Sequence, residues 1–389
     1  MMRIGIIAGE ASGDLLGAHL MASLQTRFPS LEFIGIAGPR MQALGATSLF
    51  PMEKLAVRGY VEVLKHYREI RGIQRDIVNT FQNQPPDLFI GIDAPDFNLG
   101  VEEKLKAAGV TTIHYVSPSI WAWRKERIHR IKRAVSHMLT IFPFEAKIYE
   151  QAGIPVSYVG HTLADEIPLE IDRAAARRAL NIEADTPVIA LLPGSRVSEL
   201  DYHAELFAAT ALQIGKSLPN ACFIAPFASP TTQQQFEAAI KKADADKLRI
   251  MCLQGASQQA LAAADVALIK SGTSTLEAAL MKCPMVITYR VSAVSAWLMR
   301  RMGRGYLPYI GLPNILAGEF IVPELLQEDA TPENLAQALL NSYRDESLRA
   351  KLKARFLTIH QSLRQNSAER IGDALAQYLD PGSASARAG

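Results

Sequence analysis

The fold is decided by the stretch Lys270-Ser-Gly-Thr-Ser-Thr-Leu-Glu-Ala-Ala-Leu-Met281. The apolar run before it, Ala264–Ile269, is typical of a buried parallel strand. Ser271, Gly272 and Thr273 then form a tight turn, and strong helix formers follow from Leu276 to Met281. A strand, a Gly/Ser/Thr turn and a helix together place backbone N–H groups at the positive end of a helix dipole. This arrangement predicts an anion site, most often one for phosphate.

Glu277 lies about one turn inside that helix, where its carboxylate could face the hydroxyls of a ligand. The alternative is an ordinary turn in which Ser or Thr caps the helix and Glu277 complements the helix dipole. The stretch alone does not decide between the two. Features elsewhere in the chain favour the anion-site interpretation over the ordinary turn.

The same strand–turn–helix pattern recurs on both sides of this stretch. Residues 3–8 form a strand that ends at Gly9-Glu-Ala-Ser-Gly-Asp14, and Val188–Leu192 ends at Pro193-Gly194-Ser195-Arg196. Neither turn is Gly-x-Gly-x-x-Gly, which disfavours a nicotinamide oxidoreductase. Strands alternate with helices throughout, so we expect an α/β protein of two doubly wound, Rossmann-like domains with a ligand cleft between them.

Composition fits that organisation. The 389 residues are 49% hydrophobic and 21% charged, which is typical of a folded globular protein long enough for two domains. The net charge is only +2, so nucleic acid is not an expected partner. Three widely spaced cysteines, no secretory signal and no long apolar span predict a cytoplasmic protein with buried thiols.

We place the first domain at residues 1–168 and the second at 187–345, with a linker at 166–186 between them. Helices at 346–379 and a disordered tail at 380–389 follow.

Polar residues at strand ends are the candidates for chemistry, because ligands of parallel sheets bind beyond the carboxyl ends of the strands. The strand Asp87–Ile92 ends in Gly91-Ile-Asp-Ala-Pro-Asp-Phe-Asn98. Asp93 is the chemical candidate there, whereas Asp96 and Asn98 are expected to form the turn and cap the next helix. In the second domain Arg196 has the side chain best shaped to grip a phosphate.

Two regions combine basic and bulky apolar residues. The segment from Trp121 to His137 has a net charge of +5, and Trp297-Leu298-Met299-Arg300-Arg301-Met302 mixes apolar groups with arginines. Either could lie on an anionic lipid surface, and the first could instead face a phosphate-bearing substrate. For the first, a solvated helix face with one tryptophan in the core is an equal alternative.

Seven blocks in a fixed order carry a resemblance to a known family. Besides Ser271–Glu277 they are Ala8–Asp14, Gly91–Asn98, Tyr115–Arg124, Gly160-His161, Leu191–Arg196 and Leu312–Gly318. With them the chain resembles lipid A disaccharide synthase, an inverting glycosyltransferase of the GT-B fold, from about residue 3 to residue 375. No role is expected for Lys270.

The resemblance implies two lipid substrates. UDP-2,3-diacylglucosamine would donate its sugar to the 6-hydroxyl of 2,3-diacylglucosamine 1-phosphate, giving a β-1′,6 disaccharide and UDP. It also implies that the first domain holds the acceptor and the second the nucleotide, with C-terminal helices returning toward the first domain. The enzyme would need neither a metal nor a cofactor and would lie on the cytoplasmic leaflet of the inner membrane. A homodimer is one assembly that the sequence leaves open.

Roles then follow for individual residues. Asp93 is the candidate base for the acceptor hydroxyl, with Glu10 the runner-up. Ser195, Arg196 and the Ser271–Thr273 turn would bind the diphosphate, and Glu277 the ribose. Asn314, expected in a loop that can reach the cleft, is a further nucleotide-binding candidate. Trp297, Leu298, Met299, Arg300 and Arg301 are the expected membrane contact.

Two other functions remain open at this point. A UDP-N-acetylglucosamine 2-epimerase would share the fold and the Ser-Gly…Glu turn, and it would turn over a water-soluble sugar nucleotide. A membrane-peripheral protein could instead keep the fold and bind sugar nucleotides without turnover, in which case no UDP would be released.

Overall fold

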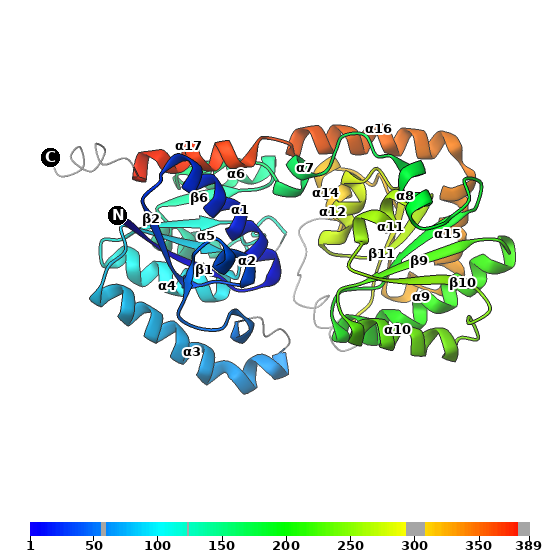
Figure 1. Ribbon diagram of the computed structural model, residues 1–389, viewed down its shortest axis with the longest axis horizontal. Helices are drawn as coiled ribbons and strands as arrows, with labels where there is room; N and C mark the ends of the chain where they lie inside the picture. Colours follow the sequence, from blue (N-terminus) through cyan, green and yellow to red (C-terminus); the bar gives the residue numbers. More distant parts are fainter. Residues whose placement is uncertain (56–59, 123, 293–307, 380–389) are drawn as a thin grey trace. The chain divides into compact units, whose positions relative to one another are not determined.

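Alternating strands and helices fold into two compact units in the computed structural model (Figure 1), which describes residues 1–55, 60–122, 124–292 and 308–379. One unit comprises Met1–Asp165 together with the chain from Leu363 onward, and the other comprises Glu166–Ser362. The predicted tail at 380–389 and the predicted membrane contact, Trp297–Arg301, lie outside the described residues.

The first unit is built on a seven-stranded parallel sheet of order β3-β2-β1-β4-β5-β6-β7. The order reverses direction at β1 and β4, which makes this pair the switch point where a doubly wound sheet binds its ligand. Both strands are apolar and largely buried, as expected for a sheet covered by helices on both faces. The strands are β1 (Met2–Ala8), β2 (Leu31–Ile36), β3 (Thr47–Ser48), β4 (Leu88–Ile92), β5 (Thr111–Tyr115), β6 (His137–Thr140) and β7 (Val156–Tyr158).

Helices follow most strands of this sheet. They are α1 (Ala11–Arg27), α2 (Pro39–Ala43), α3 (Tyr60–Asn83), α4 (Pro95–Ala107), α5 (Arg127–Ala134), α6 (Pro143–Gln151), α7 (Thr162–Glu166) and α17 (Ser367–Leu379), with a 3-10 turn at Met52–Lys54. The last of them, α17, packs on α1. An ion pair joins Arg27 to Asp373, and the Ser367 hydroxyl lies 3.2 Å from His19 Nε2. The return of the C-terminal helices to the first unit is therefore confirmed for α17.

A six-stranded parallel sheet of order β10-β9-β8-β11-β12-β13 forms the second unit. Its switch point lies between β8 and β11. The strands are β8 (Val188–Leu192), β9 (Cys222–Phe227), β10 (Arg249–Gln254), β11 (Val266–Lys270), β12 (Met285–Tyr289) and β13 (Glu324–Leu326). The helices are α8 (Arg173–Ala179), α9 (Val197–Ser217), α10 (Pro230–Lys242), α11 (Ser257–Ala263), α12 (Thr273–Leu280), α14 (Leu312–Ala317), α15 (Pro332–Arg344) and α16 (Glu346–Leu363), with a 3-10 turn at Gln327–Asp329.

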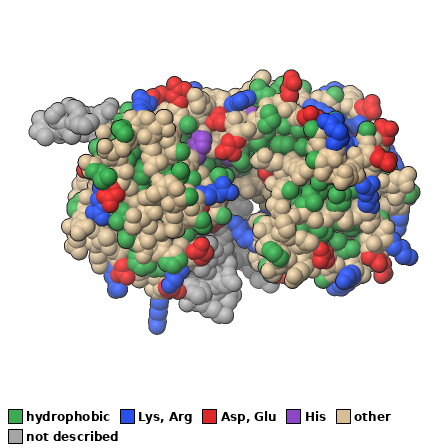
Figure 2. Space-filling view, in the orientation of Figure 1, with side chains coloured by type: hydrophobic (Ala, Val, Ile, Leu, Met, Phe, Trp, Pro, Cys, Tyr) green, Lys and Arg blue, Asp and Glu red, His purple; other side chains and the backbone are tan. Residues whose placement is uncertain are grey.

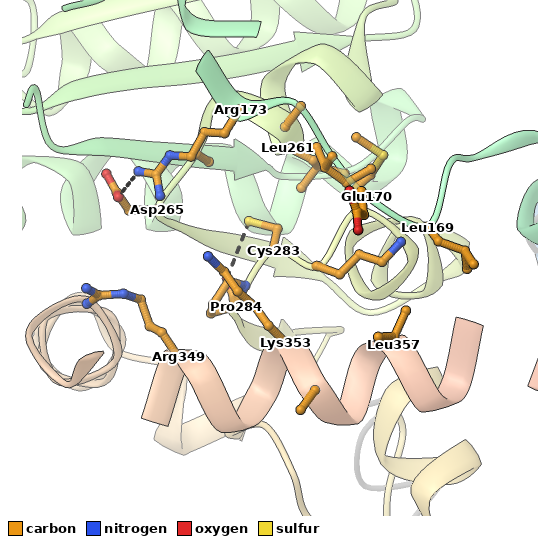
Figure 3. Close-up of a pocket in the computed structure, with 16 residues that line it drawn as sticks. Leu169, Glu170, Arg173, Leu261, Asp265, Cys283, Pro284, Arg349, Lys353 and Leu357 are labelled. Atoms are coloured by element: carbon orange, nitrogen blue, oxygen red, sulfur yellow. Dashed lines mark hydrogen bonds and ion pairs between the residues drawn. The ribbon is translucent and has the colours of Figure 1, made fainter. Parts of the chain in front are cut away.

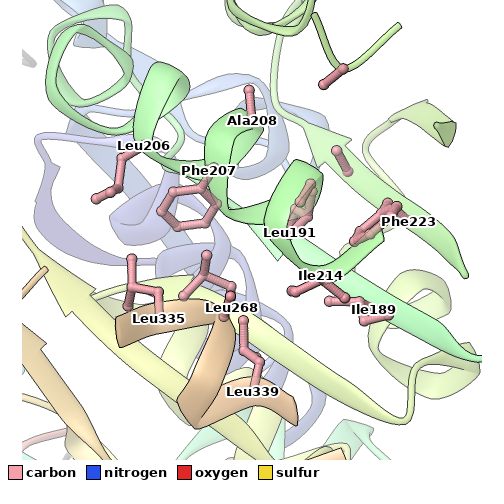
Figure 4. Packing of buried hydrophobic residues seen from close by; sticks show 14 of the residues in the cluster. Ile189, Leu191, Leu206, Phe207, Ala208, Ile214, Phe223, Leu268, Leu335 and Leu339 are labelled. Atoms are coloured by element: carbon pink, nitrogen blue, oxygen red, sulfur yellow. The ribbon is translucent and has the colours of Figure 1, made fainter. Parts of the chain in front are cut away.

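The core of the second unit lies between β8, β9 and β11 and the helices α9 and α15. Phe207 of α9 lies near Leu268 of β11 and Leu335 of α15 (Figure 4), and all three are at most 1% exposed. This core holds the central strands rigidly, so the loops at their carboxyl ends have fixed starting points.

The segment 166–186 was expected to be a linker, but it belongs to the second unit. Asp172 caps α8 by accepting a hydrogen bond of 2.8 Å from the Ala175 N–H. Arg177 is only 5% exposed and pairs with Asp265 at 2.9 Å. A buried, paired arginine ties this segment to β11, which composition alone did not indicate.

Of the three cysteines, Cys222 and Cys283 are buried and Cys252 is half-buried, and all are free thiols. On the face drawn in Figure 2, charged side chains of both signs are scattered among hydrophobic ones. None of the helices in the described part of the chain combines the length and the hydropathy that a membrane span requires.

Candidate active site

The two candidate bases follow neighbouring strands. In the parallel register Ala8 of β1 pairs with Ile92 of β4, so Glu10 and Asp93 each lie two residues or fewer beyond the same edge of the sheet. The two loops touch, because a Cβ on Gly9 would lie 2.7 Å from the Cβ of Ala94. The structure thus brings together the two loops that the sequence singled out separately.

The backbone at this edge is unusual. Asp93 and Ala94 have φ angles of 50° and 42°, and Val116, just after β5, has φ of 81°. Left-handed conformations are uncommon for residues other than glycine and are least favourable for a β-branched residue such as valine. The Asp93 N–H donates to the Tyr115 carbonyl at 2.9 Å, which links the two strained loops. Strained backbone concentrated at one sheet edge is typical of functional sites.

The polar side chains near Asp93 have structural partners. Asp96 is exposed in the first turn of α4 and pairs with Arg127, as expected of a turn residue. Asn98 does not cap the helix as expected. Ala94 occupies the N-cap position, and Asn98 is completely buried with its amide directed at backbone carbonyls. Asp14 accepts hydrogen bonds from Arg40 N and Met41 N and so anchors the start of α2.

A buried polar network fixes the loop after β5. The Trp121 indole N–H donates to Glu145 Oε1 at 2.9 Å, and Phe142 N donates to Oε2 at 3.1 Å. Ser117 Oγ lies 2.7 Å from the Tyr149 hydroxyl. Glu145 is 1% exposed, and burial raises its pKa to about 7 despite these hydrogen bonds. Nothing in the sequence pattern pointed to Glu145 beyond its place at the start of a helix.

The glycine–histidine block of the first unit lies at the end of β7. Burial lowers the pKa of His161 to about 4, although Asp165 opposes the shift. The imidazole is therefore neutral near pH 7, with Nδ1 accepting a hydrogen bond of 3.2 Å from Leu163 N.

In the second unit, Glu199 organises the turn after β8. Its Oε2 accepts from Ser195 N at 2.9 Å, and its Oε1 lies 2.9 Å from Arg196 Nη1 and 2.8 Å from Lys270 Nζ. Burial favours a higher pKa for Glu199, but the hydrogen bond and charge of Lys270, with Ser195 and Arg196, leave its pKa below the usual range. Two cations, Arg196 in the turn after β8 and Lys270 at the end of β11, therefore share one carboxylate.

Lys270 is a site residue that the sequence analysis left without a role. It ends β11, directly before the Ser271–Thr273 turn, and its side chain is 14% exposed. Its ammonium also lies 5.4 Å from the centre of the Tyr289 ring. The sequence feature that could have identified Lys270 is its position at the end of a predicted strand, in a domain whose other turn carries an arginine.

The turn after β11 opens α12 at Thr273, three residues before the predicted start. Gly272 and Thr273 are exposed, and the Ser271 hydroxyl donates to the Ile310 carbonyl at 3.1 Å. The first N–H groups of a helix have no partner within it and lie at the positive end of the dipole. This edge can accordingly bind an anion beside Arg196, because β8 and β11 are neighbours in the sheet.

Glu277 is half-buried on α12. Burial raises its pKa, while the Ser257 hydroxyl, which donates to Oε1 at 2.9 Å, partly offsets the shift. Gln258 of α11 also donates a hydrogen bond to this carboxylate, so two neighbouring side chains of α11 position Glu277.

The expectation for Asn314 is wrong about its surroundings. The residue lies in α14 rather than in an open loop, and it is completely buried. Its amide donates to Val322 O at 2.9 Å and Glu324 Oε1 at 2.8 Å, and its oxygen accepts from Ile321 N and Val322 N. All of these contacts are internal, so Asn314 fixes the entry to β13 and has no free donor for a nucleotide.

The basic segment near Trp121 is largely paired. In α5, Arg130 and Arg133 both contact Glu103 of α4, and Arg127 contacts Asp96. These contacts favour the alternative of a solvated helix face, because the paired Arg130 and Arg133 side chains remain exposed.

A cavity of about 380 Å³ lies in the second unit (Figure 3). Its walls include Asp265 and Cys283, just before β11 and β12, and Lys353 of α16. It is therefore at the amino ends of these strands, the opposite edge of the sheet from Lys270, and its lining includes none of the predicted site residues. Within the described ranges, no three His, Cys, Asp or Glu side chains are grouped so that they could hold a metal ion.

Comparison with known proteins gives consistent results. A family model described as lipid-A-disaccharide synthetase matches residues 4–377. The lipid-A-disaccharide synthase of Dechloromonas aromatica (strain RCB) is 54% identical over 380 residues, covering 97% of this chain and 99% of the relative. That of Thiobacillus denitrificans (strain ATCC 25259 / T1) is 54% identical over 375 residues, covering 96% and 99%.

Solved structures establish the fold. MurG from Acinetobacter baumannii superposes with a TM-score of 0.58 at 16% identity, covering 97% of this chain and all of the other. A UDP-GlcNAc 2-epimerase from Neisseria meningitidis, bound to UDP-GlcNAc, superposes with a TM-score of 0.63 at 11% identity, also covering 97% and 100%. MurG is a GT-B glycosyltransferase, so this chain has the GT-B fold, and at these identities the likeness extends to the fold alone.

Proposed function

The chain belongs to the lipid-A-disaccharide synthase family, and from this premise we propose that it transfers 2,3-diacylglucosamine from UDP-2,3-diacylglucosamine to 2,3-diacylglucosamine 1-phosphate. It is a glycosyltransferase of lipid A biosynthesis. The products of the proposed reaction are UDP and the β-1′,6-linked disaccharide 1-phosphate, formed with inversion at the anomeric carbon. The observation that carries the proposal is a family match that spans residues 4–377.

Asp93 accepts the proton in this mechanism. The 6-hydroxyl of the acceptor attacks the anomeric carbon of the donor, and its proton passes to the Asp93 carboxylate as the new C–O bond forms. Its position at the switch point of the first sheet supports this role, as does the strained backbone that presents it. Glu10, on the adjoining loop, is the alternative base.

The second unit stabilises the leaving group. As the bond from the anomeric carbon to the diphosphate oxygen breaks, negative charge develops on UDP. Arg196, Ser195 and the N–H groups at the start of α12 are fixed donors that meet this charge. Glu277, held in place by Ser257 and Gln258, accepts hydrogen bonds from the ribose hydroxyls.

Binding the diphosphate changes the partners of Arg196. The Arg196 guanidinium lies 2.9 Å from Glu199 Oε1, and its side chain is 42% exposed. The diphosphate competes for the guanidinium, while Lys270 keeps Glu199 neutralised and in place. Glu199 thus positions the Arg196 side chain, which stays exposed enough to bind the diphosphate.

We assign membrane contact to Trp297, Leu298, Met299, Arg300 and Arg301, with apolar groups inserted in the cytoplasmic leaflet of the inner membrane and arginines at the headgroups. Changing Trp297, Leu298 and Met299 to serine is expected to reduce sedimentation with anionic vesicles. Unchanged sedimentation would remove the segment from the proposal.

The catalytic role is tested by UDP release from the parent, Asp93→Asn and Glu10→Gln with both lipid substrates in detergent. Asp93→Asn is expected to lose about 10²–10⁴-fold in kcat with UDP affinity unchanged, because the base is gone but the second unit is intact. If Glu10→Gln shows that loss while Asp93→Asn stays near the parent rate, the base is Glu10.

A further inference from the structure

Asn98 connects the ends of two neighbouring strands. It lies in the first turns of α4 and is completely buried. Its Nδ2 donates to the Asp93 carbonyl at 2.8 Å and to the Ile92 carbonyl at 3.2 Å, and it lies 3.5 Å from the carbonyl of Ile7. Its two amide hydrogens are thus directed at the carboxyl end of β4, beside the end of β1.

These bonds act on a turn that its own sequence does not favour. Asp93 and Ala94 both have left-handed φ angles, and neither residue is glycine. Such conformations persist only where surrounding contacts impose them. The Asn98 side chain provides such a contact, because it donates to the carbonyls of Ile92 and Asp93.

The packing around Asn98 is tight. A Cβ on Gly91 would lie 3.0 Å from the Asn98 Cβ and 2.1 Å from Glu102 Oε1. Glu102 is itself held by His114, with Glu102 Oε1 and His114 Nδ1 2.7 Å apart and both side chains fully buried. Gly91 therefore leaves space for Asn98 against β4, and the neighbouring acid is already paired.

We propose that Asn98 is a positioning residue for the reaction, because its amide fixes the backbone of the Asp93 turn and thereby aims the Asp93 carboxylate at the acceptor hydroxyl. This inference rests on the proposed function and on Asp93 as the base. It replaces the helix-capping role that the sequence suggested for Asn98. A misplacement of about 1 Å at a reacting group can lower turnover about 100-fold, so a buried residue that touches no substrate can control the rate.

The side-chain chemistry limits what can replace Asn98. The two carbonyl oxygens require donors, which an aspartate of the same shape cannot supply. Serine keeps one donor on a shorter side chain, and alanine keeps none. The proposal therefore predicts a graded loss of kcat, with Asn98→Ala lowest and Asn98→Ser between it and the parent.

The test measures UDP release and UDP affinity for the parent, Asn98→Ser, Asn98→Ala and the control Val101→Ala. Val101 is also fully buried on α4, so its variant reports the cost of a smaller side chain on the same helix. Asn98→Ala is expected to lose about 10–100-fold in kcat with UDP affinity within about 2-fold of the parent. Val101→Ala should keep the parental kcat at a temperature where all variants are folded.

A double variant separates positioning from general destabilisation. If Asn98 acts through Asp93, adding Asn98→Ala to Asp93→Asn lowers kcat no further, because the carboxylate to be aimed is already absent. Losses that multiply would overturn the proposal, and so would equal losses in Asn98→Ala and Val101→Ala. If Asn98→Ala does not fold, the same comparison is made with Asn98→Ser.

Failure of the underlying function is recognised separately. No UDP release from the parent would refute the synthase reaction itself. Parental activity in Asp93→Asn would leave the reaction standing but remove Asp93 as the base, and with it the role proposed for Asn98.

Discussion

Single residues at the two sheet edges serve the site and hold the local structure at the same time. Glu199 orders the Ser195 turn and pairs with both Arg196 and Lys270, so its negative charge offsets the repulsion between these two cations. Asn314 differs, because all of its hydrogen bonds are internal. Residue type and spacing predicted that these side chains lie near the candidate site. Their burial, which only the structure shows, determines which of them can contact a ligand.

Arg196→Ala is expected to weaken UDP binding about 10–100-fold, the loss typical of a charge-assisted hydrogen bond to phosphate. Isothermal titration calorimetry with UDP measures it. Arg178→Ala serves as the control, because Arg178 is exposed on α8, away from the carboxyl edge of the sheet. Equal affinity of Arg196→Ala and the parent would remove Arg196 from the nucleotide site.

Glu145 gives a pH-dependent prediction. Burial raises its pKa to about 7 in the folded protein, above the value of 4.5 for an exposed carboxyl group. Its contribution to stability is therefore fully present below about pH 4.5 and is lost as the pH rises toward and through 7, because the folded state must then hold a buried charge. The parent should lose about 1–3 kcal/mol from this group between pH 5 and pH 8.

Glu145→Gln should lack that component, since it cannot ionise. Urea unfolding of both proteins at pH 5 and pH 8 measures it as the difference between the two pH effects. The comparison is needed because His161, whose pKa is lowered to about 4, acts in the opposite direction and loses its contribution as the pH falls below about 6.5. Equal pH effects in the two proteins would show that Glu145 does not titrate in this range.

The central strands of both sheets were predicted well, whereas two short edge strands were missed. The central strands β1, β4, β8 and β11 were expected within about two residues of their observed bounds, since burial on both faces leaves an apolar run. The two-residue β3 and three-residue β13 carry too little pattern to detect. Both lie at the edges of their sheets.

The start of α4 was predicted too late. The helix begins at Pro95, ahead of Asp96 and Asn98, because a proline fits the first turn of a helix, where its missing N–H costs nothing. The sequence pattern treated the same proline and its flanking acids as a turn. This shift places Asn98 inside the helix, where it reaches the carbonyls of Asp93 and Ile92.

The contact between α17 and α1 gives a prediction about stability. Leu375→Ala should lower the free energy of unfolding of the first unit by about 2–5 kcal/mol, since Leu375 is completely buried. Arg27→Ala should cost less than about 1 kcal/mol, because its ion pair with Asp373 is largely exposed. Urea unfolding monitored by circular dichroism tests both. Equal effects would mean that α17 is held by its charges instead of by its apolar face.

At the scale of the whole molecule, both halves share one arrangement, in which the carboxyl edge of a doubly wound parallel sheet carries the candidate site residues. The alternation of strands and helices predicted this architecture. It did not reveal that residues 166–186 belong to the second unit, because the decisive contact is a pair between Arg177 and Asp265, 88 residues apart. The strained backbone at Asp93 and Val116 could not be predicted from the sequence either, since it exists only once the strands are assembled.

The central claim is tested most directly by identifying the product that the parent enzyme makes from UDP-2,3-diacylglucosamine and 2,3-diacylglucosamine 1-phosphate. UDP release and mass spectrometry are followed with and without the acceptor, and UDP-N-acetylglucosamine alone is the comparison substrate. The account predicts that UDP appears in step with a β-1′,6 disaccharide 1-phosphate, and only when both lipids are present. Epimerisation of UDP-N-acetylglucosamine, or no UDP release with both lipids present, would contradict it.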